Sequence, residues 1–190
     1  MKWFDEAGIL LEDGKRGMLE GFGTEIYPDG TRRRTFNIRD DCMGEVGMMY
    51  AMDYVKNRTE RSKQIAGNLF SYCYDYMQCK EEGPFHGMVG WTDSAWGVCY
   101  THDTARLIVG ELLQNLYLGT DTHMQEIQDA LDYLIRTSGS DGLRARRLDN
   151  VNLDEEKIRQ IHSSPCDDPE PGDAYFFMAL LIFYKITGLE

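Results

Sequence analysis

Basic residues are scarce in this 190-residue sequence: 20 Lys and Arg stand against 32 Asp and Glu, for a formal net charge of −12. An acidic surface repels phosphate backbones, so we expect no nucleic-acid partner. Long hydrophobic runs are also lacking. The longest spans only residues 174–183, whereas a membrane helix needs about 20 apolar residues. We therefore expect no membrane partner and a soluble protein, cytoplasmic or, if a signal peptide has been removed, periplasmic.

Several motifs that carry cofactors are absent. The five cysteines form no Cys-x-x-Cys pair, and the four histidines form no i, i+4 pair. We therefore expect free thiols, no metal and no other cofactor. The chain also has no phosphate-binding Gly-x-x-x-x-Gly-Lys, no dinucleotide fingerprint and no Gly-x-Ser-x-Gly. These absences argue against nucleotide-dependent chemistry and serine hydrolysis.

The sequence does contain a unit that recurs about three times. Asp41, Asp103 and Asp173 each begin an apolar segment with small residues. The hydrophobic spacing predicts helices over 41–57, 103–118 and 173–187. Second helices are expected after the first two units, over 60–80 and from Thr120 or Asp121 to 137. A repeated helix pair predicts an array in which each unit buries its apolar face against its neighbours.

Smaller elements complete the prediction. Residues 1–11 indicate a short helical end, and residues 154–162 a short helix within the polar loop 138–172. Pro28-Asp29-Gly30 predicts a turn, since proline fixes φ and glycine permits positive φ. The flanking residues are expected to pair as a small β-hairpin. The last helix is apolar on every side, which predicts burial on most sides.

Several of these segments resemble the six-hairpin glycosidase superfamily, and in particular its poorly characterised bacterial members. The similar segments are Glu20-Gly-Phe, Pro28-Asp-Gly, Arg39-Asp-Asp-Cys-Met-Gly-Glu and His102-Asp-Thr-Ala-Arg. The resemblance implies an (α/α)6 toroid, with a pocket built from the loops that precede the inner helices. We expect an all-α array with one small β-hairpin. It forms a single domain over residues 1–190, as part of a larger toroid.

The third unit lacks its second helix, so the array predicted here is an incomplete ring. We expect the exposed core faces to be covered either by a second copy of the chain or by the remainder of a longer parent chain.

The aspartates before the predicted inner helices are the candidate catalytic groups. Glycoside hydrolysis needs a pair of carboxyl groups, one protonated and one ionised. Asp41 and Asp103 are the predicted pair, and Asp40 and Arg39 are predicted substrate contacts. The alternative is that each aspartate is a helix N-cap. Arg39 and Arg106 could bind a substrate carboxylate, although pairing with these aspartates is the more common role.

Aromatic residues gather in the glycine-rich loop 81–101. Trp91, Trp96 and Tyr100 are predicted substrate contacts, because apolar sugar faces stack on aromatic rings. The alternative is that these rings pack as core over the helices. His102 is predicted to contact substrate or transfer a proton, with a hydrogen bond to the loop backbone as the ordinary alternative.

The function predicted from these observations is a glycoside hydrolase-like domain that binds or cleaves a saccharide. The first alternative is a non-catalytic helical scaffold or interaction module, in which the aspartates are caps. A sugar epimerase or isomerase ranks third, since it would need paired histidines and only His86 and His102 lie in the relevant loop.

Overall fold

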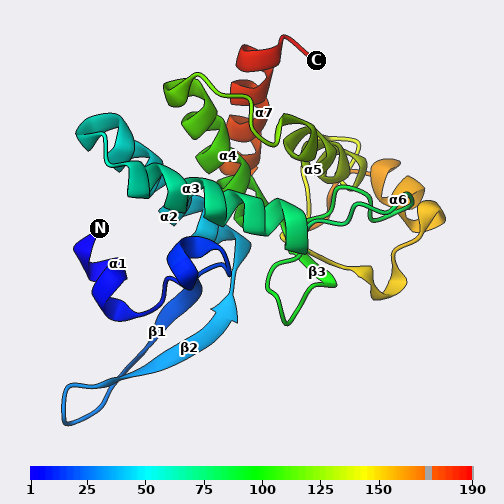
Figure 1. The fold of residues 1–190 in the computed structure, drawn as a ribbon. Helices are drawn as coiled ribbons and strands as arrows, with labels where there is room; N and C mark the ends of the chain where they lie inside the picture. The colour runs from blue at the N-terminus through cyan, green and yellow to red at the C-terminus, as the bar shows by residue number, and fades with distance from the viewer. Residues whose placement is uncertain (170–172, 190) are drawn as a thin grey trace.

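The computed structural model of the chain describes residues 1–169 and 173–189, so residues 170–172 of the predicted loop 138–172 lie outside it. The described residues form seven α-helices and two antiparallel strand pairs (Figure 1). The helices are α1 (Lys2–Ala7), α2 (Asp40–Asn57), α3 (Glu60–Tyr72), α4 (Thr101–Leu118), α5 (Met124–Arg136), α6 (Glu155–His162) and α7 (Asp173–Thr187). The strands are β1 (Leu19–Ile26), β2 (Arg32–Ile38), β3 (Val98–Tyr100) and β4 (Arg147–Asp149). The prediction of a mainly α fold with a small β-hairpin is confirmed.

The three aspartate-led helices lie side by side, as the repeat predicts. Helix α2 packs on α4, α4 packs on α7, and α3 packs on α2 (Figure 1). Fully buried side chains from successive helices meet in one core, including Met43 of α2, Leu69 of α3 and Leu107 of α4. Among the described residues, no helix combines the length and apolar character needed to cross a bilayer.

Small residues set the distance between α2 and α4. A Cβ atom added to Gly44 would lie 2.4 Å from the Leu107 Cα, and one added to Gly110 would lie 2.5 Å from the Gly44 carbonyl oxygen. No side chain larger than hydrogen fits at either position. The repeated small residues therefore allow direct contact between the two helix backbones.

The β-hairpin follows its predicted turn. Gly30 has φ of 80°, and the Asp29 carboxylate accepts a hydrogen bond from the Thr31 N–H. Leu19 pairs with Ile38 at the far end of the hairpin, directly before α2. The second strand pair, β3 with β4, was not predicted from the sequence; its two strands are three residues each and far apart in the chain.

Some helix boundaries differ from the predictions. Helix α4 begins at Thr101, so Asp103 lies in its first turn and not before it. Helix α5 begins after His123, because Thr120 and Thr122 donate their hydroxyl hydrogen bonds to Asn115 instead of capping α5. The predicted helix 60–80 ends at Tyr72 and continues as one π-helical turn to Met77.

The burial of helix α7 differs most from the prediction. The sequence predicts burial on most sides, but only Phe176, Ala179 and Phe183 join Asp173 in the buried face that meets α4. Leu181 and Tyr184 are exposed on the other side. The prediction was wrong because an all-apolar sequence does not report how many neighbouring helices are present.

A pair formed by a buried glutamate and a partly buried histidine joins α4 to the start of α5. The Nδ1 atom of His123 lies 2.7 Å from the Oε1 of Glu111, which has no exposed surface. The Tyr74 ring stacks on His123 at 5.1 Å. Burial raises the pKa of Glu111. Burial opposes the charge on His123, but the hydrogen bond and charge of Glu111 outweigh it and raise the histidine pKa.

This pair predicts pH-dependent stability. Because the folded state binds the His123 proton more tightly than the unfolded state, its stabilisation is complete below about pH 6.5 and is lost as pH rises through the raised pKa. In urea titrations from pH 5.5 to 8.5, His123→Gln should remove about 1 kcal/mol of this dependence. Ser71→Ala removes only the 3.3 Å contact of the Ser71 hydroxyl with the His123 Nε2 atom and keeps the pair, so it should retain most of the dependence. A His123 pKa at or below 6.5 in an NMR titration contradicts the prediction.

The glycine contact predicts opposite effects for two Gly-to-Ala substitutions. Gly44→Ala should lower the free energy of unfolding by about 3 kcal/mol, since the new methyl group overlaps the α4 backbone. Gly67→Ala is the control, because no atom lies within 4 Å of its added Cβ. It should raise the stability by about 0.5–1 kcal/mol through helix propensity. Equal effects of the two substitutions in urea unfolding would show that the α2–α4 spacing is not limited by Gly44.

Candidate functional site

The Arg39 side chain occupies the centre of the candidate site. It makes two hydrogen bonds of 2.9 Å to the Asp41 carboxylate, one of 3.2 Å to Asp103 and one of 3.0 Å to Glu20. Burial disfavours its charge, but Asp41 and Asp103 outweigh that cost and raise the pKa of the guanidinium. Three segments distant in the sequence are thus joined by one side chain.

Asp41 and Asp103 come from the first turns of neighbouring helices. One carboxylate oxygen from each, together with one from Asp40, lies within 4.8 Å of the others. Both residues are near the start of their helices, and the close packing of α2 on α4 brings the two starts together. Neither carboxylate caps its helix: the N-cap residues are Arg39 and Tyr100, without side-chain cap bonds.

Oxygen-rich clusters also bind hard cations. In this cluster two arginines already neutralise the carboxylates, because Arg106 lies 3.4 Å from Asp41 and adds to the contacts of Arg39. The pairing of both arginines with aspartates matches the more common role expected from the sequence. The donor set therefore suits a balanced charge cluster better than a metal centre.

Asp103 differs from Asp41 in its surroundings. The Nε2 atom of His102 lies 2.8 Å from the Asp103 Oδ1. Burial, followed by the charge of Asp41, raises the pKa of Asp103, although His102 and Arg39 act in the opposite direction. A carboxyl group whose pKa is raised keeps its proton to a higher pH than an ordinary aspartate and can donate it.

Asp40 is buried more deeply than Asp41. It has no exposed surface, and burial followed by the charges of Asp103 and Asp41 raises its pKa well above the ordinary value. Its carboxyl oxygens accept hydrogen bonds from the Asp41 N–H and the Thr104 hydroxyl. Its role as a substrate contact stays a prediction, and the structure adds a supporting role at the start of α2.

Trp91 and Tyr100 meet beside the charge cluster. Their ring centroids are 5.0 Å apart at an interplanar angle of 61°, and the Arg39 guanidinium lies 5.4 Å from the Trp91 ring. The His102 ring lies 6.0 Å from Tyr100. Four predicted site residues from one loop and the start of two helices are therefore neighbours.

Trp96 and His86 lie apart from this group. Trp96 is partly exposed and its backbone closely approaches Gly90. In the described part of the chain, no ring contact links Trp96 to the Asp41–Asp103 pair. His86 lies 3.5 Å from Asp129 of α5. His86 and His102 therefore contact different carboxylates, which weakens the epimerase alternative.

Two site residues were missed from the sequence. Glu20 reaches Arg39 because the pairing of Leu19 with Ile38 places it beside the start of α2. Tyr175 of α7 lies under Arg106, with the guanidinium 5.2 Å from its ring. Glu20 belongs to the Glu20-Gly-Phe segment, but that segment does not indicate its contact with Arg39, and Tyr175 belongs to no motif. Only the strand register and the packing of α7 on α4 indicate them.

Comparisons with known proteins give a match at the level of fold. No family model matches the chain, and no curated protein matches it. Among solved structures, the chain is similar to an α-amylase from Clostridium perfringens, with a TM-score of 0.56 and 15% sequence identity. The match covers 80% of this chain and 41% of that chain. The chain thus has a helical fold like that of a glycosidase.

The geometry predicts a large effect of removing Arg39. Arg39→Gln would leave Asp41 and Asp103 buried without their shared counter-charge, which should lower the free energy of unfolding by about 3 kcal/mol at pH 7. The control is Arg61→Gln, whose partners Asp5 and Asp13 are more exposed. It should cost about 1 kcal/mol or less. Urea unfolding measures both, and similar losses would contradict the central role of Arg39.

Proposed function

We propose that this chain is a carbohydrate-active domain of the glycoside hydrolase type and forms part of an (α/α)6 toroid. Asp41 and Asp103 are its catalytic carboxylates. The proposal rests on one observation: these two carboxylates come from successive inner helices and lie close together, and their different surroundings give them different proton affinities. The fold-level similarity to an α-amylase supports it. The activity belongs to the assembled pocket, of which this chain supplies a part.

The two aspartates take different roles. Asp41 accepts hydrogen bonds from Arg39 and lies against Arg106, and such charged donors favour an ionised carboxylate. Asp103 carries the raised pKa and is the proton donor to the glycosidic oxygen. The oxygen separation of at most 4.8 Å is closer to the ~5 Å of retaining enzymes than to the ~6.5–9.5 Å of inverting ones. Asp41 is therefore the nucleophile.

The residues around the carboxylates contact the sugar in this proposal. Trp91 and Tyr100 lie beside the carboxylates and are the proposed sugar contacts, although arginine side chains already lie over both rings. His102 can exchange a proton with Asp103. The Arg39 and His102 side chains are each about one-fifth exposed, whereas Asp41 and Asp103 are 5% and 2% exposed. A substrate therefore reaches the carboxylates past Arg39 and His102. Trp96 is a more distant contact in this proposal.

The test is turnover of chromogenic α- and β-glycosides and of soluble α-glucans. Asp41→Asn and Asp103→Asn should each lower kcat by about 10²–10⁴-fold with an unchanged fold, because each removes a proton-transfer or nucleophilic group. Exposed Asp121→Asn is the control and should retain full turnover. A wild-type chain that binds none of these saccharides contradicts the proposal, because the site residues that this chain supplies would then not contact a sugar.

One observation favours the scaffold alternative. The carboxylates are almost fully buried and ion-paired, as in a cluster that only joins α2 to α4. In that case Asp41→Asn and Asp103→Asn would lower the melting temperature, and no saccharide would bind. A lowered melting temperature is expected in both cases, because each substitution removes a carboxylate partner of Arg39. Saccharide binding by the wild type, together with loss of turnover in variants that remain folded, excludes this alternative.

A further inference from the structure

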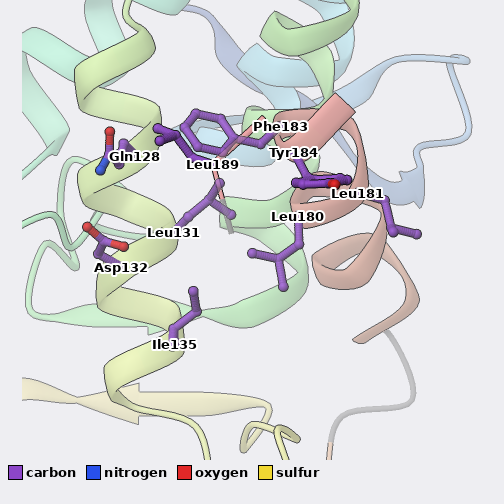
Figure 2. A pocket seen from close by; sticks show the side chains of 9 residues that line it. All are labelled: Gln128, Leu131, Asp132, Ile135, Leu180, Leu181, Phe183, Tyr184 and Leu189. Atoms are coloured by element: carbon purple, nitrogen blue, oxygen red, sulfur yellow. The ribbon is translucent and has the colours of Figure 1, made fainter. Parts of the chain in front are cut away.

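Reactive side chains outside the candidate site gather at the start of α5. The groove between the later part of α5 and α7 has a volume of about 410 Å³ and is lined mainly by apolar side chains such as Leu131 and Phe183 (Figure 2). The start of α5 differs, because a serine, a histidine and a glutamate meet there. They are Ser71 of α3, His123 at the start of α5 and Glu111 of α4.

These three side chains form a continuous chain of polar contacts. The Ser71 hydroxyl lies 3.3 Å from the Nε2 atom of His123, and the His123 Nδ1 atom lies 2.7 Å from the Oε1 atom of Glu111. Because the two contacts use opposite ring nitrogens, the imidazole can accept a proton from the serine while it donates one to the glutamate. This order of nucleophile, base and orienting carboxylate is that of a catalytic triad.

Such triads are recognised by geometry and not by a sequence motif. The absence of Gly-x-Ser-x-Gly therefore excludes one way of building a serine nucleophile, in which the serine lies on a sharp turn after a strand. Ser71 instead lies near the end of a helix and meets its base through the packing of three helices.

The contacts around the histidine hold it in one orientation. Glu111 has no exposed surface and also accepts a hydrogen bond of 3.1 Å from the Thr122 hydroxyl. The Tyr74 ring stacks on the His123 ring. His123 has φ of 52°, a conformation that is uncommon for residues other than glycine. Surrounding contacts are needed to keep such a conformation, and it occurs preferentially at active sites.

The nucleophile and the base are accessible, whereas the carboxylate is shielded. Ser71 is half-buried and the His123 side chain is 19% exposed, but the Glu111 side chain has no exposed surface. A reacting group can thus approach the hydroxyl and the imidazole without bringing water to the carboxylate. The partial exposure favours a small acyl group over a bulky one.

The start of α5 also supplies hydrogen-bond donors. His123 is the N-cap residue of α5, and its side chain does not cap the helix. The first N–H groups of a helix have no carbonyl partner within that helix, and the positive end of the helix dipole lies there. In α5 these groups directly follow the histidine. Donors of this kind stabilise the negative charge that develops on an acyl oxygen.

We propose that Ser71, His123 and Glu111 form a second catalytic site, which hydrolyses small carboxylic esters. The Ser71 Oγ atom attacks the ester carbonyl carbon while its proton passes to the His123 Nε2 atom. The bond between the carbonyl carbon and the alcohol oxygen then breaks, and the alcohol leaves with that proton. Glu111 is a positioning residue that stabilises the protonated imidazole.

Water completes the reaction. A water molecule attacks the acyl group on Ser71 and gives one proton to His123, the bond from the acyl carbon to Ser71 breaks, and the serine oxygen takes the proton back as the carboxylic acid leaves. No residue of this site belongs to the Arg39 cluster. The inference is therefore independent of the proposed glycoside hydrolase function.

Labelling with a fluorophosphonate probe tests the site, because such probes bond covalently to activated serines and mass spectrometry locates the adduct. The wild-type chain should be labelled at Ser71, and Ser71→Ala should lose the adduct together with the hydrolysis of p-nitrophenyl acetate that depends on it. Ser62→Ala is the matched control. Ser62 lies on the same helix, but its hydroxyl donates to Asp53 and not to a histidine. It should keep wild-type labelling.

The pH dependence of labelling distinguishes catalysis from a structural contact. Burial lowers the pKa of His123, but the hydrogen bond and charge of Glu111, with the charges of Glu126 and Asp75, raise it overall. Only the unprotonated imidazole accepts the serine proton, so the labelling rate should rise with pH through this raised pKa. Glu111→Gln removes the largest of these charges. It should move the midpoint to lower pH and reduce the plateau rate about tenfold or more.

His123→Gln should reduce the labelling rate by about 10²–10⁴-fold, since it removes the base. Circular dichroism checks that each variant is folded, and Glu111→Gln supplies the test if His123→Gln does not fold. Two results would overturn the proposal. One is a folded wild-type chain without an adduct at Ser71 at a saturating probe concentration. The other is an unchanged labelling rate and pH midpoint in the folded variants of His123 or Glu111.

Discussion

The contact between the α2 and α4 backbones is the constraint on which the rest of the structure depends. Gly44 lets α4 approach at a distance that no side chain permits, and Gly110 does the same from the other helix. This approach places the first turns of the two helices together. Asp41 and Asp103, which are 62 residues apart in the sequence, then share the guanidinium of Arg39. Packing of small residues therefore determines the electrostatics of the site.

The charge cluster is balanced internally. Several carboxylates of this acidic chain lie together in the cluster. Burying them would cost folding free energy if Arg39 and Arg106 did not pair with them. The cluster includes one carboxyl group with no exposed surface, Asp40, and one beside a histidine, Asp103. These different surroundings give neighbouring carboxylates different proton affinities. The same residues that stabilise the helix junction are thus suited to acid–base chemistry.

Helix α7 connects the site to the exposed edge of the array. Its buried side packs on α4, its Tyr175 lies under Arg106, and its outer side is apolar. The solved structure that the chain resembles is matched over 41% of its length. The contact of Tyr175 with Arg106 thus connects α7 to the charge cluster.

The sequence by itself determined the helices that begin near Asp41, Asp103 and Asp173, the Pro28-Asp29-Gly30 turn and the residues of the charge cluster. These features follow from hydrophobic period, turn chemistry and a recurring motif, all of which are local. It did not indicate Glu20 as a partner of Arg39, the β3–β4 pair or the exposed side of α7. Only the tertiary structure decided these, because they depend on which distant segments pack together and on where that packing stops.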